Sequence, residues 1–272
     1  MRLGVLSDIH AVTDASRRDA WHNAYDFAGL EGRLRKARAL FARERVELLV
    51  VLGDLAHDGD LVSLRKVLGA LGGGPPLRLV GGNHDGARPT AGLREAGAAT
   101  AELPGWRAAT VAGGVRVAGA RVACQAVDRC RLARRPALAT WGEGPVLLAS
   151  HFPLLSREGV LTRRDLPYAE DLLDRGALAA PIIARGVPTL ALCGHLHVRD
   201  SASAGALLQL SCGALVEPPF EATVLELRVR GEELEVERSA HELARAPERR
   251  DPRLVPAREI WRYRPARGWR RR

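Results

Sequence analysis

Long apolar runs are missing from this 272-residue chain, because no stretch reaches the roughly eighteen apolar residues that a membrane-spanning helix needs. The N-terminal segment meets its first acidic residue at Asp8. This leaves no room for the apolar stretch and cleavage site of a secretory signal peptide. Together these absences predict a cytoplasmic protein without a membrane span.

Cysteine is scarce, and its spacing matches no common framework. The four cysteines, Cys124, Cys130, Cys193 and Cys212, form neither a C-x-x-C pair nor an arrangement that indicates a zinc ribbon or a set of disulfides. Free cysteine behaves as a small apolar side chain and is often buried. We therefore expect four buried free thiols.

Excess charge is nearly absent from the body of the chain. The net charge is +9, but residues 245–272 alone hold eleven Arg and three acidic residues, a surplus of +8. Such a basic segment suits contact with nucleic acid, acidic lipid or a protein partner. A solvated, partly disordered end explains the same composition. We divide the chain into a folded domain, residues 1–244, and an Arg-rich C-terminal tail, residues 245–272.

What the chain does contain is a series of short apolar runs between amphipathic helices. Strands are predicted over 3–6, 46–52 and 77–80, with helices over 30–41 and 61–71 between them. This alternation indicates βαβ units and a largely parallel sheet. Short strands are expected between 106 and 127, and a helix over 168–185 that Pro181 interrupts. Further strands are predicted over 146–149, 189–193, 206–211, 222–230 and 232–238.

Five of these strands are each followed closely by a side chain that can bind a metal: Asp8, Asp54, Asn83, His151 and His195. In open α/β sheets, ligands bind at the carboxyl ends of the strands, so the five segments are expected to meet at one place. The pairs Asp8 and His10, and His195 and His197, have i, i+2 spacing. In an extended backbone this spacing puts both side chains on the same side.

Carboxylate, imidazole and amide oxygen together suit Zn, Mn, Fe or Ni, whereas Ca and Mg prefer oxygen ligands alone. A carboxylate that bridges two such ions holds them about 3.5–4 Å apart, a separation that stabilises both the attacking and the leaving oxygen in phosphoryl transfer. Two divalent ions, two carboxylates and a bridging hydroxide leave the site positive, so that it prefers an anion.

The series Asp8-x-His10, Gly53-Asp54, Gly82-Asn83-His84-Asp85, His151 and Gly194-His195-x-His197 resembles the full signature of the calcineurin-like metallophosphoesterases. The resemblance covers roughly residues 1–240 and is strongest to the bacterial class III cyclic-nucleotide and glycerophosphodiester phosphodiesterases. It implies a four-layer α/β/β/α sandwich with mixed central sheets. It also makes residues 1–244 the catalytic domain, whereas the Arg-rich tail has no counterpart in the signature.

By this resemblance, Asp54 bridges two divalent transition-metal ions. One ion is held by Asp8, His10, Asp54 and His197, and the other by Asp54, Asn83, His151 and His195. His84 binds no metal but faces the phosphate and gives a proton to the leaving oxygen. The implied function is hydrolysis of a small phosphodiester, of the cyclic-nucleotide or glycerophosphodiester type, by a metal-bridging hydroxide.

Two other functions stay open. The basic tail motivates a nuclease or nucleic-acid end-processing phosphoesterase, although the body lacks the clustered aromatic and basic residues that bind single strands. A non-catalytic protein-binding scaffold is the second, and the presence of all seven ligands in the sequence argues against it. The sequence does not indicate an oligomeric state.

Histidines outside the signature have two interpretations each. His57 either orients a ligand or lies in a surface loop, and the loop is favoured. His22 either lines the mouth of the site with Trp21 and Tyr25 or belongs to an ordinary amphipathic helix. Substrate specificity is expected in the loops 13–26, 86–90 and 131–144.

Overall fold

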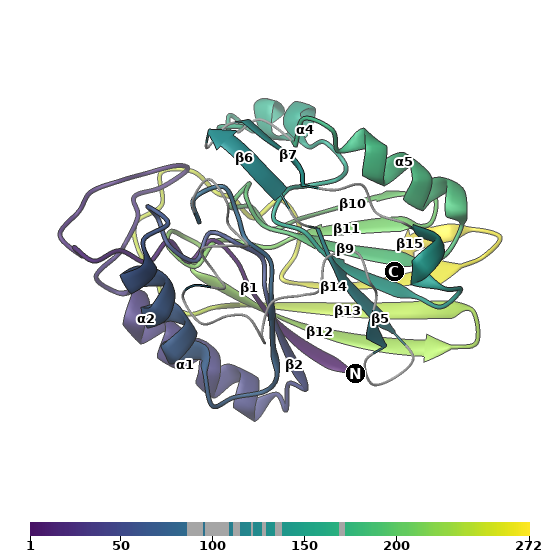
Figure 1. The fold of residues 1–272 in the computed structure, drawn as a ribbon, viewed down its shortest axis with the longest axis horizontal. Coiled ribbons are helices and arrows are strands. Elements are labelled where there is room, and N and C mark those ends of the chain that lie inside the picture. The colour runs from purple at the N-terminus through teal and green to yellow at the C-terminus, as the bar shows by residue number, and fades with distance from the viewer. Residues whose placement is uncertain are drawn as a thin grey trace.

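The computed structural model describes residues 1–85, 95, 109–110, 115–120, 122–126, 129–133, 138–168 and 172–272. Two mixed β-sheets pack face to face, and helices cover their outer faces (Figure 1). The first sheet has seven strands in the order β15-β14-β13-β12-β1-β2-β3, and the second has six in the order β10-β11-β9-β8-β5-β4. The predicted four-layer α/β/β/α sandwich is confirmed.

The N-terminal half of the first sheet has the predicted βαβ connectivity. Strands β1 (Arg2–Leu6), β2 (Leu48–Val51) and β3 (Leu77–Leu79) run parallel, with helices α1 (Leu30–Arg43) and α2 (Leu61–Leu71) between them. Alternate residues of β1 face opposite ways, as expected for a strand. Leu3 and Val5 enter the core between the sheets, whereas Leu6 joins the core under the helices.

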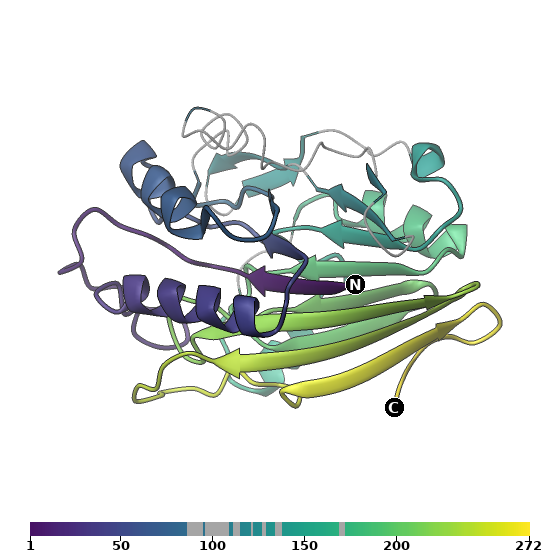
Figure 2. The same cartoon turned by 90° about the horizontal axis from the view of Figure 1, so that it is seen from below.

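The other half of the first sheet is antiparallel. It contains β12 (Glu221–Arg230), β13 (Glu233–Glu242), β14 (Arg258–Arg264) and β15 (Gly268–Arg271), and it joins β1 through β12. Figure 2 shows these long strands from below, with β14 and β15 in yellow at the edge of the sheet.

Strands β14 and β15 lie within the segment that was interpreted as a solvated end. Trp261, Tyr263 and Trp269 are buried in the core between the sheets, so that interpretation is wrong for residues 258–271. The reason lies in the period of the pattern. Trp261 and Tyr263 alternate with Arg262 and Arg264, and a strand places these two sets on opposite faces. Composition alone registered the arginines and missed the alternation.

The second sheet carries the remaining predicted strands. Strands β8 (Val146–Ala149), β9 (Thr189–Cys193) and β11 (Leu207–Ser211) are parallel, β5 (Arg116–Gly119) runs parallel to β8, and β4 (Ala109–Thr110) is antiparallel to β5. Strand β10 (Asp200–Ala204), which we did not predict, pairs antiparallel with β11. Helices α4 (Glu158–Arg163) and α5 (Gly176–Arg185) lie on the outer face.

Helix α5 differs from its prediction. It begins at Gly176 rather than at 168, and Pro181 lies inside it without ending it. Residues 169–171 of the predicted helix lie outside the described residues. Leu178 and Ile182 of α5 pack against Trp141, at the end of the 3₁₀ helix Leu138–Trp141, in the core behind the second sheet.

A small hairpin of β6 (Val122–Ala126) and β7 (Arg129–Leu132) corrects one cysteine prediction. Cys124 and Cys130 lie directly opposite each other in the hairpin and form a disulfide. Facing positions of an antiparallel pair bring two Cβ atoms close enough for this bond. Four free thiols were expected, and two are observed, Cys193 and Cys212, both buried.

Within the described ranges, no helix combines the length and the apolar character needed to cross a bilayer. The cytoplasmic location stays a prediction.

Candidate metal centre

The loops that follow β1, β2, β3, β8 and β9 meet where the carboxyl ends of these strands come together, and they bring the predicted ligands into one cluster. The ligands come from both sheets, and every one is buried: Asp8, His10, Asp54, Asn83, His151, His195 and His197. Parallel strands of the two facing sheets thus provide the convergence that was expected from the sequence.

The backbone at these loops has an uncommon conformation. Positive φ angles occur at five of the seven predicted ligands: Asp8 (51°), His10 (48°), Asp54 (50°), His195 (65°) and His197 (53°). The left-handed region costs about 1–2 kcal/mol for each residue with a Cβ atom. Such strain gathers at functional sites, where the surrounding packing holds it in place.

The glycines of the signature allow the strand ends to approach. A Cβ added to Gly53, whose φ is 93°, would lie 2.7 Å from the backbone nitrogen of Gly82 and 2.7 Å from Nδ1 of His151. A Cβ on Gly194 would lie 1.8 Å from Oγ of Ser7. Any side chain at these two positions would force the two halves of the centre apart.

One group of donors gathers around His10. Its Nε2 lies 3.3 Å from Nε2 of His197 and 3.5 Å from Oδ2 of Asp54. Nε2 of His197 also lies 3.4 Å from Oδ1 of Asp8. Donor atoms of Asp8, His10 and His197 all fall within 4.8 Å of one another, which fits a single ion.

A second group gathers on the other side of Asp54. Nε2 of His151 lies 3.4 Å from Oδ2 of Asp54 and 2.7 Å from Oδ1 of Asn83. Nδ1 of His195 lies 3.2 Å from the same amide oxygen. One carboxylate oxygen of Asp54 therefore faces both groups, as a bridging ligand would.

Hydrogen bonds on the outer ring nitrogens orient the imidazoles. Nδ1 of His151 donates to the carbonyl oxygen of Leu52 at 2.7 Å, and Nδ1 of His197 donates to Oε1 of Glu217 at 2.7 Å. Each bond leaves Nε2 as the nitrogen that faces the cluster. The donor set and its orientation fit two divalent transition-metal ions.

The charges in this cluster are strongly coupled. Burial raises the pKa of Asp8, but the neighbouring His197 and His151 together outweigh burial and bring it to about 2. Burial lowers the pKa of His197, but Asp8 and Glu217 outweigh burial and raise it to about 10. His151 is raised to a pKa of about 9 against burial, chiefly by Asp54. Both imidazoles thus hold protons at neutral pH that a bound divalent ion would displace.

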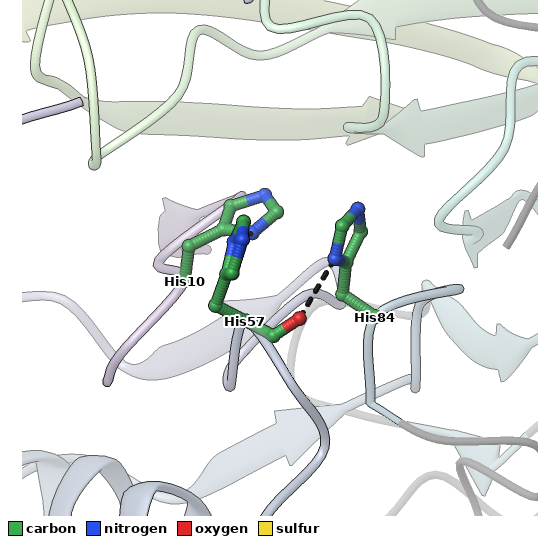
Figure 3. A group of neighbouring side chains, drawn as sticks. All are labelled: His10, His57 and His84. Atoms are coloured by element: carbon green, nitrogen blue, oxygen red, sulfur yellow. Dashed lines mark hydrogen bonds between the residues drawn. The ribbon is translucent and has the colours of Figure 1, made fainter. Parts of the chain in front are cut away.

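His84 lies at the rim of the cluster and is half-buried (Figure 3). Its backbone N–H donates to Oδ1 of Asp54 at 2.9 Å, and its Nδ1 donates to the carbonyl oxygen of His57 at 2.8 Å. These two bonds fix the ring and leave Nε2 free of protein acceptors among the described residues. That arrangement suits contact with a substrate; its role in proton transfer stays a prediction.

Two acidic residues of the centre escaped the sequence analysis. Asp85 is buried and ties the end of β3 to the loop after β2. Its Oδ1 accepts from the backbone N–H groups of Leu55 and Ala56 at 2.7 and 3.0 Å, and its Oδ2 accepts from that of Gly82 at 2.8 Å. Asp85 had been quoted in the signature without a role.

Glu217 is the second, and it is fully buried. Its Oε2 accepts from the backbone N–H of Asn23 at 2.5 Å, so that both carboxylate oxygens are bonded. A carboxylate behind a metal-binding imidazole fixes the tautomer and raises the basicity of the ring. The only sequence signal was an acidic residue directly before Pro218-Pro219.

Glu217→Gln is expected to weaken binding of one ion by about 10–100-fold. Gln can still accept the hydrogen bond from His197, but it lacks the negative charge that makes the imidazole of His197 a stronger metal ligand. Isothermal titration of the metal-free protein with Mn²⁺ measures the change. Glu221→Gln is the matched control, since Glu221 is also buried but pairs with Arg199. Equal affinity in Glu217→Gln and the unmodified protein would contradict this role.

The loop 13–26 covers this cluster, as expected for a specificity loop. The ring of Tyr25 lies 5.4 Å from that of His10, and Nε2 of His22 donates to the carbonyl oxygen of Leu196 at 2.8 Å. No helix forms there, so the helical interpretation of His22 is wrong. Residues 86–90 lie outside the described residues, and Trp141 of the loop 131–144 packs in the core behind the second sheet.

His57 also differs from the favoured interpretation. It is buried rather than part of a surface loop, and its Nδ1 lies 3.0 Å from Nδ1 of His10.

Comparison with known proteins agrees with this geometry. A family model described as calcineurin-like phosphoesterase matches residues 1–199. The chain belongs to this family. Members of the calcineurin-like family use divalent metal ions, and membership makes the protein a metal-dependent hydrolase of phosphate esters.

Similar solved structures extend the likeness of the fold. A dimetal phosphatase from Danio rerio is 13% identical, with 89% of this chain and 96% of that chain covered and a TM-score of 0.60. The protein TT1561 of Thermus thermophilus is 15% identical, with 89% and 99% covered and a TM-score of 0.57. None of the curated proteins compared with the chain matches it. At these identities the structures establish the fold alone.

Proposed function

We propose that this calcineurin-like phosphoesterase hydrolyses a small phosphodiester, of the cyclic-nucleotide or glycerophosphodiester type, with two divalent transition-metal ions. Asp8, His10, Asp54 and His197 would hold one ion, and Asp54, Asn83, His151 and His195 the other. The observation that carries the proposal is Oδ2 of Asp54, which lies 3.5 Å from the imidazole of His10 and 3.4 Å from that of His151.

When bound, two such ions activate water at neutral pH and neutralise charge on a phosphate. The protein then has three tasks. Asp54 keeps the two groups of ligands together. Tyr25 and the rest of loop 13–26 cover the centre and limit access of solvent. His84, fixed by the carbonyl of His57, directs Nε2 toward the substrate and delivers a proton to the leaving oxygen.

The charge of the centre favours a diester over a monoester. Asp8, Asp54 and Glu217 are three buried carboxylates that would stand against the four positive charges of two divalent ions. With a bridging hydroxide the centre would be about neutral, and a neutral centre suits the single negative charge of a phosphodiester better than the two charges of a monoester.

Metal-stripped protein refilled with Mn, Zn, Fe or Ni is expected to cleave bis-p-nitrophenyl phosphate faster than p-nitrophenyl phosphate. The release of p-nitrophenolate measures both rates under identical conditions. If turnover depends on metal but the monoester is cleaved faster, the proposed substrate class changes from phosphodiesters to phosphomonoesters. No turnover with either substrate, with two ions bound, would favour the selective nuclease or the non-catalytic scaffold.

Part of the basic segment lies beside the metal centre, because the backbone N–H groups of Arg249 and Arg250 donate to Oδ1 of Asn23 in loop 13–26. The arginines of β14 and β15 give the nuclease alternative little support. Strand β13 ends at the same side of the sheet as the metal centre. Strand β14 runs antiparallel to β13 and therefore begins at that side and ends at the opposite one. The β14–β15 turn thus lies at the side of the sheet away from the metal centre. The arginines there surround a shallow cavity: Arg262, Arg264, Arg267, Arg270 and Arg272. A strand about seven residues long spans about 20 Å, so a bound nucleic acid would have to cross most of the sheet to reach the centre.

A further inference from the structure

His57 contacts the cluster without belonging to either group of predicted ligands. Figure 3 shows its ring beside that of His10, and the centroid of its ring lies 5.1 Å from that of His10 and 5.0 Å from that of His84. Nδ1 of His57 lies 3.0 Å from Nδ1 of His10, and Nε2 of His57 lies 3.0 Å from Oδ2 of Asp19. A chain of contacts therefore runs from a half-exposed carboxylate, through a buried imidazole, to a predicted metal ligand.

The hydrogen-bonding groups of Asp19 and His57 decide which nitrogen of His10 carries a hydrogen. A carboxylate only accepts, so Asp19 requires the hydrogen of His57 on Nε2. A neutral His57 then presents a lone pair at Nδ1. Because two nitrogens 3.0 Å apart share one hydrogen, Nδ1 of His10 must be the donor. Nε2 of His10 is left with its lone pair, and this nitrogen faces Asp54 and His197.

We infer that Asp19 and His57 are positioning residues that hold His10 in its metal-binding tautomer, through the contacts Asp19–His57–His10. The inference rests on the metal centre of the proposed function. Loss of the acceptor at His57 allows His10 to place its hydrogen on Nε2, where it blocks the lone pair that binds the ion. Neighbouring imidazoles are set in the same way, His197 by Glu217 and His151 by the carbonyl of Leu52.

The side chain and the backbone of His57 serve different partners. The ring contacts His10, whereas the carbonyl oxygen accepts from Nδ1 of His84 at 2.8 Å. A side-chain substitution at position 57 removes the first contact and keeps the second. The tautomer of His84 is therefore an internal control in the same molecule.

The test combines four variants of the full-length, metal-free protein. His57→Leu removes the acceptor, and His57→Gln restores one through its side-chain oxygen. Asp19→Asn replaces the obligatory acceptor by a group that also donates. Asp58→Asn is the matched control, because Asp58 is a neighbouring exposed carboxylate that forms its ion pair with Arg17.

Two measurements are made on each variant. NMR of protein labelled with ¹⁵N-histidine identifies the protonated nitrogen of His10, and titration with Co²⁺, followed by visible absorption, gives the affinity for each ion. His57→Leu and Asp19→Asn are expected to shift His10 toward the Nε2–H tautomer. They are also expected to lower the affinity for one of the two ions by about 10–100-fold. His57→Gln and Asp58→Asn are expected to behave as the unmodified protein does.

An unchanged His10 tautomer and unchanged Co²⁺ affinities in Asp19→Asn and His57→Leu would overturn the inference. So would a third bound Co²⁺ that His57→Leu abolishes, because donor atoms of His10, His57 and His84 also lie within 4.8 Å of one another and His57 would then be a ligand. Neither readout depends on hydrolysis. A protein that binds two ions and shows the tautomer shift, yet cleaves no phosphate ester, would refute the proposed function and leave this inference standing.

Discussion

Asp54→Ala is expected to lose both metal ions and all measurable hydrolysis together. Its Oδ2 faces both groups of predicted ligands, at 3.5 Å from His10 and 3.4 Å from His151. Without it, each group keeps three donors, and His10 and His151 lose their shared carboxylate. The affinity for each ion is expected to fall by more than about 100-fold, beyond the effect of losing an outer partner.

His84→Ala is expected to keep both metal ions and to lose hydrolysis. Metal content is retained, because the ring of His84 bonds only to the backbone carbonyl of His57 among the described residues. Turnover of bis-p-nitrophenyl phosphate is expected to fall by about 10²–10⁴-fold, the usual loss on removal of a general acid. Metal analysis by mass spectrometry and the same assay, applied to both variants, separate the two roles.

Asp58→Ala is the control for this pair, since Asp58 lies four residues from Asp54 on an exposed site that pairs with Arg17. It should keep both ions and full turnover. Two bound ions in Asp54→Ala would contradict the bridging position. Full turnover in His84→Ala would show that the leaving oxygen takes its proton from another source.

The clustering of the predicted ligands could be foreseen because they follow strands directly. Asp8, Asp54 and His195 each come within a few residues of a strand end, and the connectivity of parallel strands brings such positions to one side of a sheet. Gly53 and Gly194 marked the places where two strand ends approach too closely for a side chain. Local pattern and overall topology agreed at these positions.

The residues that support the ligands were not predictable in the same way. Glu217 lies 20 residues from His197 in sequence, and Asp19 lies 38 residues from His57, so their contacts depend on how loops fold over the centre. His57 follows a turn and has the composition of a surface loop, yet loop 13–26 buries it. Such partners become visible only when tertiary packing is known.

The sequence analysis missed the C-terminal strands β14 and β15 for another reason. Eleven arginines in residues 245–272 gave the segment the average composition of a solvated end, and the average concealed three buried aromatic side chains. Truncating Trp or Phe in a core costs about 3–5 kcal/mol each. Since whole domains are stable by only about 5–15 kcal/mol, a chain without residues 258–271 is expected to unfold. Their deletion would therefore not test a role in nucleic-acid binding.

Glu259→Gln is expected to lower the free energy of unfolding by about 3–5 kcal/mol, because it leaves a buried charge without its partner. Arg238 is fully buried and pairs with Glu259, and Nη1 of Arg238 also donates to the carbonyl oxygen of Asp200 at 3.0 Å. Oγ of Ser201, in the second sheet, donates to Oε1 of Glu259 at 3.1 Å. This network joins β13 and β14 of the first sheet to β10 of the second, where the two sheets meet at their edges.

Urea unfolding measures the change, and a double substitution is the control. Arg238→Met combined with Glu259→Leu removes both charges and keeps similar volumes, so its midpoint is expected close to that of the unmodified protein or above it. The comparison separates the cost of an unpaired charge from a general defect in packing. If Glu259→Gln unfolds at the same urea concentration as the unmodified protein, the pair does not hold the two sheets together. If the double variant is as unstable as the single one, the sheets depend on the hydrogen bonds that Arg238 and Glu259 make to β10 rather than on the neutralisation of charge.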